Sequence, residues 1–157
     1  MRLLEIEESA AGSFDRNPFA IRHHLAEHPL FAPDRLLELS RGPSGDRAEY
    51  CAGDVPLYAS PGKAPSIRLT LQETIRQIES CGAWVVLKNV ELDPEYGALL
   101  DRCLDEVGQV CGPARRGSSD RAGFIFISSA KAVTPCHLDP EHNFLLQIRG
   151  AKTIHIG

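Results

Sequence analysis

The residues whose types and spacing could do chemistry lie near the end of the sequence, around His137 and Asp139. These two residues are two positions apart, so on an extended backbone both side chains leave the same face and can converge on one ion. An imidazole nitrogen with a carboxylate oxygen is a donor set suited to a divalent first-row metal. Two ligands alone would hold a metal weakly, and the two-His-one-carboxylate site of non-haem Fe(II) oxygenases requires one more histidine. A hydrogen-bonded His–Asp pair at a strand end is the alternative interpretation.

The surrounding sequence, TPCHLDPEHNFLLQIRGAKT at residues 134–153, resembles the metal-binding segment of JmjC and cupin-like Fe(II)/2-oxoglutarate oxygenases. Its spacing is closest to bacterial cupin-like proteins that are similar to the asparaginyl hydroxylase that inhibits hypoxia-inducible factor. A looser likeness extends upstream through Asp54, Trp84 and residues 124–128. The segment of about twenty residues is fairly specific, because it fixes ligands, co-substrate residues and a turn together.

The resemblance implies a role for each matching position. His137 and Asp139 would be the first two Fe(II) ligands, whereas Thr134, Asn143 and Lys152 would hold the co-substrate 2-oxoglutarate. Lys152 would pair with the distal carboxylate, a role suited to lysine because a buried carboxylate must be paired. A lone lysine after a turn is otherwise usually a solvent-facing residue. The implied reaction consumes O2, converts 2-oxoglutarate to succinate and hydroxylates a C–H group.

Candidates for the substrate pocket are Phe124, Phe126, Leu145 and Gln147. Strand alternation puts Phe124 and Phe126 on one face, and the resemblance directs that face towards the substrate cavity. The substrate could be a protein side chain or a small molecule. The sequence leaves both open.

The second histidine of the family lies on a strand well beyond the lysine, and this sequence ends at Gly157. We therefore expect the N-terminal part of an oxygenase that lacks the distal histidine and is inactive by itself. The alternative is a non-catalytic cupin-like module that binds an anion or a protein partner. An unpaired edge on the final strand would favour a homodimer.

Composition and charge narrow the function classes. The 157 residues suffice for one domain, and 43% hydrophobic with 24% charged residues is ordinary for a globular protein. A net charge of −4 argues against general binding to nucleic acid or to a membrane surface. The acidic start MRLLEIEESA does not resemble a signal peptide, and five cysteines form an odd set without a CxxC pair. We expect a cytoplasmic protein with reduced thiols.

The remaining sequence predicts the elements that position these residues. Residues 1–17 carry no strong pattern and indicate a poorly ordered lead-in, whereas 18–157 read as one incomplete domain. Helices are expected from Pro33 to before Gly42, from the capping box that begins at Thr70, and from Asp93 to Gly112. Short strands or extended pieces are expected at 19–25, 49–51, 83–87, 124–127 and 143–149, with a tight turn at 150–151.

Helices first and strands later indicate an α+β fold. With the resemblance, this fold is expected to be a double-stranded β-helix, or jelly roll, with flanking N-terminal helices. Its helical and strand part would occupy residues 18–122, and the first β-helix strands would occupy 123–157.

Other polar clusters have structural interpretations. The histidines at 23, 24 and 28 lack the ligand spacing of a metal site and are expected to be solvated or locally hydrogen-bonded. The arginines at 115, 116 and 121 favour a solvated loop, with anion binding as the alternative, and the acids at 101, 105 and 106 fall on the solvated flank of a helix.

Overall fold

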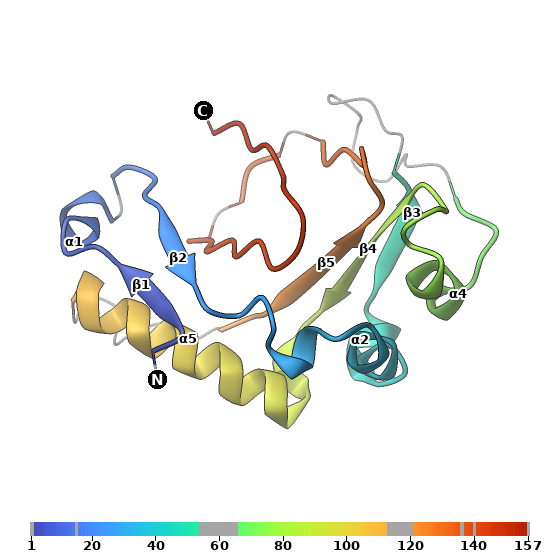
Figure 1. The fold of residues 1–157 in the computed structure, drawn as a ribbon, viewed down its shortest axis with the longest axis horizontal. Helices are drawn as coiled ribbons and strands as arrows, with labels where there is room; N and C mark the ends of the chain where they lie inside the picture. Colours follow the sequence, from blue (N-terminus) through green and yellow to red (C-terminus); the bar gives the residue numbers. More distant parts are fainter. Residues whose placement is uncertain are drawn as a thin grey trace.

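The computed structural model describes residues 2–14, 16–53, 66–112, 121–135, 137–139 and 141–156. These residues form a mixed α+β fold with two small antiparallel sheets (Figure 1). One sheet pairs β1 (Leu4–Ile6) with β2 (Ile21–His23), and the other has the order β3 (Glu49–Ala52), β4 (Ala83–Lys88), β5 (Phe124–Ser128). The α+β prediction is confirmed. No closed barrel is formed within the described ranges, so the double-stranded β-helix stays a prediction.

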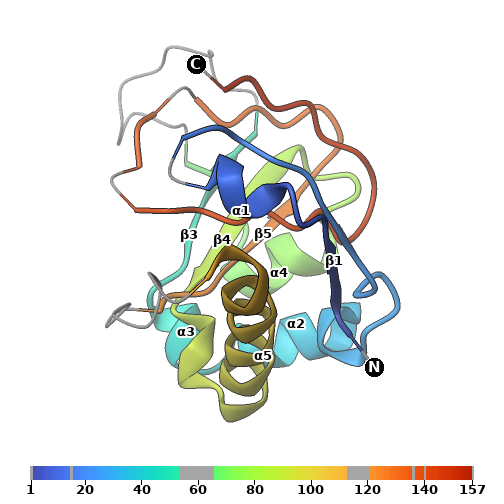
Figure 2. The same cartoon turned by 90° about the vertical axis from the view of Figure 1, so that its left-hand side faces the viewer.

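The helices are α1 (Ala10–Ser13), α2 (Pro33–Leu39), α3 (Pro43–Asp46), α4 (Leu71–Arg76) and α5 (Pro94–Cys111), with single 3₁₀ turns at Pro29–Phe31 and Val90–Leu92. The long helix α5 runs beneath both sheets in Figure 1, and Figure 2 looks along it with α1 above. None of the helices in the described part of the chain is both long and apolar enough to cross a lipid bilayer.

The expected starts of α4 and α5 are confirmed by their capping hydrogen bonds. At α4 the Thr70 hydroxyl accepts from the backbone N–H of Glu73, whose carboxylate accepts from the Thr70 N–H, so the capping box is complete. At α5 the Asp93 carboxylate accepts from the N–H of Glu95, and Pro94 occupies the first helical position. Each cap satisfies donors that would otherwise lack a partner.

The core lies between the β3-β4-β5 sheet and the helices. On β4, Val85 and Leu87 are fully buried and face the packed side of the sheet. From α5, Tyr96, Leu99 and Val107 enter the same cluster, and the Tyr96 hydroxyl donates to the carbonyl of Leu30 at 2.5 Å. Burial of this apolar surface is the main force that holds the sheet against α5.

The N-terminus differs from the poorly ordered lead-in expected at residues 1–17. Leu3 and Leu4 are buried, and β1 pairs with β2 in the register Leu4 to His23. The Glu106 carboxylate on α5 accepts from the backbone N–H groups of Leu3 and Leu4 at 2.8–2.9 Å. The ordering comes from partners about a hundred residues away in the chain, which the local sequence does not show.

The segment after β5 also differs from expectation. Residues 143–149 were predicted to form a strand, but the structure assigns no strand there. Phe144, Leu146 and Ile148 still pack against the core at alternate positions, so the side-chain alternation of a strand is kept. A strand also needs a ladder of backbone hydrogen bonds. Here a side chain connects the segment to the first sheet: the His23 Nε2 lies 3.0 Å from the Gln147 carbonyl oxygen.

Candidate functional site

The His137 and Asp139 side chains face each other, with Nε2 of His137 3.5 Å from Oδ2 of Asp139. The other ring nitrogen, Nδ1, lies 2.8 Å from the Pro135 carbonyl oxygen. A carbonyl can only accept, so Nδ1 carries a proton in this contact. In the neutral ring, Nε2 therefore has its lone pair free and directed towards the carboxylate.

This geometry fits a shared metal ion. Two donors bonded at about 2.1 Å, with an angle of 90–109° at the metal, are about 3.0–3.4 Å apart. The observed 3.5 Å between Nε2 and Oδ2 is close to that separation. Metal-binding histidines commonly donate their second ring N–H to a carbonyl or carboxylate, as His137 does to Pro135. Both side chains are about half exposed, so the pair is open to solvent.

Asn143 fixes the carboxylate of the pair. Its Nδ2 donates to Asp139 Oδ2 at 2.6 Å. This hydrogen bond restricts rotation of the carboxylate and keeps it turned towards His137. The resemblance places Asn143 at the co-substrate, whereas in the structure its side chain contacts Asp139.

Lys152 and Thr134 form a second polar pair. The Lys152 Nζ donates to the Thr134 hydroxyl at 3.2 Å and lies 5.9 Å from the centre of the Phe126 ring. Gly150 lies two residues before Lys152 with φ of 71°, a left-handed conformation that glycine adopts without steric cost, and the chain bends at residues 149–150. An ammonium and a hydroxyl side by side can hold one end of a carboxylate.

The predicted pocket residues lie on an open surface. Phe124 and Phe126 are 49% and 54% exposed on one face of β5, whereas Ile125 and Ile127 pack on the core from the other face. Leu145 is also about half exposed, and the Gln147 side chain folds back to donate to the Arg149 carbonyl at 2.7 Å. Alternation on β5 is confirmed. An enclosed cavity over these residues is not formed by the described part of the chain.

A surface hollow in the described part of the chain lies elsewhere. Its volume is about 270 Å³, and it sits between α2, α3 and the start of α5, where Arg35 and Asp93 form part of its wall. Arg35 is already bound there to the Asp93 carboxylate at 2.7 Å. This hollow shares no residue with the His137–Asp139 pair.

The histidines near the N-terminus have hydrogen-bond partners, local ones for His28 and for Nδ1 of His23, and more distant ones for His24 and for Nε2 of His23. His24 Nε2 lies 2.8 Å from the Glu5 carboxylate, and His28 Nδ1 accepts from the Leu30 N–H. His23 Nδ1 accepts from the Leu25 N–H, which leaves its Nε2–H to donate to Gln147. Across the ranges that the structure covers, no group of three His, Cys, Asp or Glu side chains is arranged to hold a metal.

The charged residues of α5 are structural. Asp101 and Asp105 pair with Arg121 at 2.7 and 3.8 Å, and Glu106 holds the N-terminal strand. Cys51, Cys81 and Cys103 are free thiols. The remaining residues of interest from the sequence lie outside the described residues: Asp54, Arg115, Arg116 and Cys136.

Sequence reasoning missed two aromatic residues that contact the site segment. The Phe14 ring lies 4.8 Å from the His142 ring and 6.1 Å from the Phe144 ring, and Phe19 lies 6.5 Å from Phe144, measured between ring centres. These contacts join residues more than 120 positions apart, and no local pattern marks them.

Comparison of the chain with protein-family models, curated proteins and solved structures gives no significant match.

Proposed function

We propose that residues 134–152 form the two-ligand half of a non-haem Fe(II) site in a 2-oxoglutarate-dependent hydroxylase of the JmjC and cupin-like type. The observation that carries the proposal is the facing of His137 Nε2 and Asp139 Oδ2 at 3.5 Å, with the ring tautomer fixed by Pro135. When bound there, Fe(II) would supply O2 activation coupled to oxidation of 2-oxoglutarate.

The chain's own residues would hold and orient the reactants. Lys152 and Thr134 would take the distal carboxylate of 2-oxoglutarate, because the ammonium supplies charge and the hydroxyl a second donor. Asn143 would keep the Asp139 carboxylate turned towards His137. The exposed faces of Phe124 and Phe126 would line the substrate side, whether the substrate is a protein side chain or a small molecule.

The metal set requires a third protein donor, which we place on a histidine downstream of Gly157, because the six histidines of these 157 residues all lie in the described part of the chain and no group of three ligands forms there. Within the double-stranded β-helix that we propose, this histidine would come from a later strand. Free thiols at Cys51, Cys81 and Cys103 support the further proposal that the protein works in a reducing compartment, the cytoplasm.

A second candidate function rests on the Lys152–Thr134 pair. A cupin-like module without catalysis could bind a carboxylate through these two donors alone, with no metal. The two functions differ in whether His137 matters for binding.

Anaerobic titration of Fe(II) and 2-oxoglutarate separates them. The weak visible metal-to-ligand charge-transfer absorption of the ternary complex is measured for the unsubstituted chain, for His137→Ala, and for His155→Ala as a matched control at an exposed histidine. The proposed site predicts a band that is lost in His137→Ala and kept in His155→Ala. No band in a folded sample contradicts the metal site, and binding of 2-oxoglutarate without a band supports the second function.

A further inference from the structure

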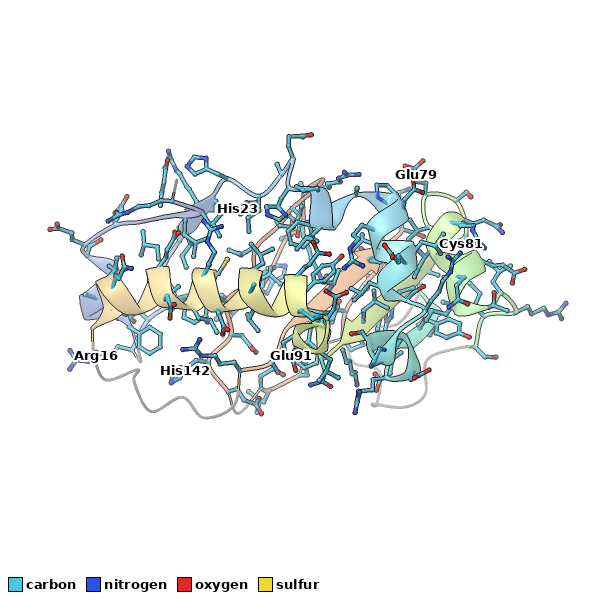
Figure 3. All side chains as sticks on the ribbon, turned by 90° about the horizontal axis from the view of Figure 1, so that it is seen from below. Arg16, His23, Glu79, Cys81, Glu91 and His142 are labelled. Atoms are coloured by element: carbon cyan, nitrogen blue, oxygen red, sulfur yellow. The ribbon has the colours of Figure 1, made fainter. Side chains whose placement is uncertain are left out.

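An aromatic cluster joins the N-terminal segment to the proposed metal segment. It consists of Phe14, Phe19, His142 and Phe144, with ring centres 4.8 to 6.5 Å apart in the four measured pairs. These separations are typical of tilted and edge-to-face aromatic packing, which contributes beyond the burial of area. Figure 3 shows the labelled Arg16, two residues after Phe14, and His142 at the same end of the molecule.

The cluster holds the two neighbours of Asn143. His142 contacts Phe14, and Phe144 contacts both Phe14 and Phe19, so the backbone on either side of residue 143 is fixed by rings. Asn143 itself is exposed and donates from Nδ2 to Asp139 Oδ2 at 2.6 Å. A displacement of this backbone would therefore move the amide that orients the carboxylate.

The N-terminal segment is anchored firmly enough to serve as a support. Its hairpin pairs β1 with β2, and the Phe14 N–H donates to the Ala10 carbonyl at 3.0 Å at the end of α1. Glu106 on α5 binds the start of β1 through its carboxylate. From β2, His23 contacts the carbonyl of Gln147, which gives the site segment a second tie to the same hairpin.

We propose that Phe14 and Phe19 are positioning residues, an aromatic clamp that sets the orientation of Asn143 and through it the Asp139 carboxylate. Neither residue touches the reacting groups. The support of Asn143 by the two rings exists in the metal-free protein. Its effect on metal binding rests on the proposed function. A loss of the clamp leaves His137 and Asp139 present but lets the carboxylate rotate away.

The test measures Asn143 directly. Solvent exchange of its side-chain amide protons is followed by NMR in the metal-free protein for the unsubstituted chain, Phe14→Ala and Phe14→Tyr. Phe31→Ala is the matched control, because Phe31 also packs on the core but its measured ring partner is His28, remote from the site segment. The clamp predicts that exchange of these protons is faster in Phe14→Ala than in the unsubstituted chain. Phe14→Tyr and Phe31→Ala should stay near the unsubstituted value.

Titration with Co(II), followed by its visible ligand-field absorption, measures metal affinity at the proposed site. Phe14→Ala should raise the Kd for Co(II) by about 3- to 10-fold, and Phe14→Tyr should restore it. Unchanged Asn143 exchange in Phe14→Ala overturns the clamp, as does an equal rise in Phe31→Ala. If the unsubstituted chain binds no Co(II), the metal site fails, while the amide measurement still decides whether the rings hold Asn143. If Phe14→Ala does not fold, Phe19→Ala is measured against the same predictions.

Discussion

Replacing Glu106 with glutamine would weaken the attachment of the first strand to α5. In the native protein the Leu3 N–H is shared between both carboxylate oxygens at 2.9 Å, and the Leu4 N–H donates to Oε2 at 2.8 Å. Hydrogen bonds to a charged group contribute about 1.5–3 kcal/mol, compared with about 0.5–1.5 kcal/mol for neutral ones. The amide oxygen of glutamine can still accept, so the expected loss over two donors is about 1–3 kcal/mol.

The same contact predicts a pH dependence. Burial raises the pKa of Glu106, whereas the hydrogen bonds from Leu3 and Leu4 lower it. The lowering effects together are larger, so the pKa is below the ordinary value. A lowered pKa in the folded state stabilises the protein above the unfolded pKa, about 4.3 for glutamate. That stabilisation is lost as the pH falls through the folded pKa. Glu106→Gln removes this titration, so its stability should fall less steeply below about pH 4.3 than that of the unsubstituted chain.

Urea denaturation at neutral pH and across the acidic range measures both effects. The control is Asp105→Asn, which removes a neighbouring exposed carboxylate of the same helix and should change the free energy of unfolding by less than about 0.5 kcal/mol. Hydrogen exchange of residues 3–6 should accelerate in Glu106→Gln alone. Equal stability of Glu106→Gln and the unsubstituted chain at neutral pH, or the same slope in acid, would refute the reasoning.

Three further outcomes are expected. Thr70→Ala removes the hydroxyl of the capping box and should cost about 1 kcal/mol in the free energy of unfolding, measured by urea denaturation. Lys152→Met should weaken 2-oxoglutarate binding about 10-fold or more in calorimetry, whereas Lys131→Met, at another exposed lysine, should not. Leu87→Ala should lower the free energy of unfolding by about 2–5 kcal/mol because Leu87 is fully buried, but Leu138→Ala, at a side chain 98% exposed, should be within about 0.5 kcal/mol.

The elements with local signals were predictable from the sequence. Thr70 and Asp93 mark helix starts through side-chain bonds that span only two or three residues. The strands β4 and β5 carry apolar and alternating patterns that fix which face is buried. The strand β1 was missed because its order depends on pairing with β2 and on Glu106, both distant in sequence. At 143–149 the alternation predicted the buried side chains correctly, but a backbone partner cannot be read from the same pattern.

In the candidate site, too, contacts with a local sequence signal were predictable and contacts between distant segments were not. The spacing of His137 and Asp139 predicted that their side chains would face each other. Asn143 was named only through the resemblance, as a 2-oxoglutarate residue, and its contact with Asp139 was not predicted. A bend at residues 149–150, with Gly150 at positive φ, lies just before Lys152, whose ammonium group contacts the Thr134 hydroxyl. The rings of Phe14 and Phe19 were not predictable, because a contact between remote segments depends on the packed fold rather than on local spacing.

The most direct test of the metal half-site follows the two nitrogens of the His137 ring by ¹⁵N NMR as Zn(II), a diamagnetic substitute, is added. The account predicts that Nδ1 stays protonated on the Pro135 carbonyl, and that Nε2 shifts to the value of a metal-bound nitrogen. In Asp139→Asn the same shift should require a higher Zn(II) concentration. A His137 ring whose Nε2 resonance does not move on addition of Zn(II), in a folded sample, would contradict the proposal that His137 and Asp139 bind a metal.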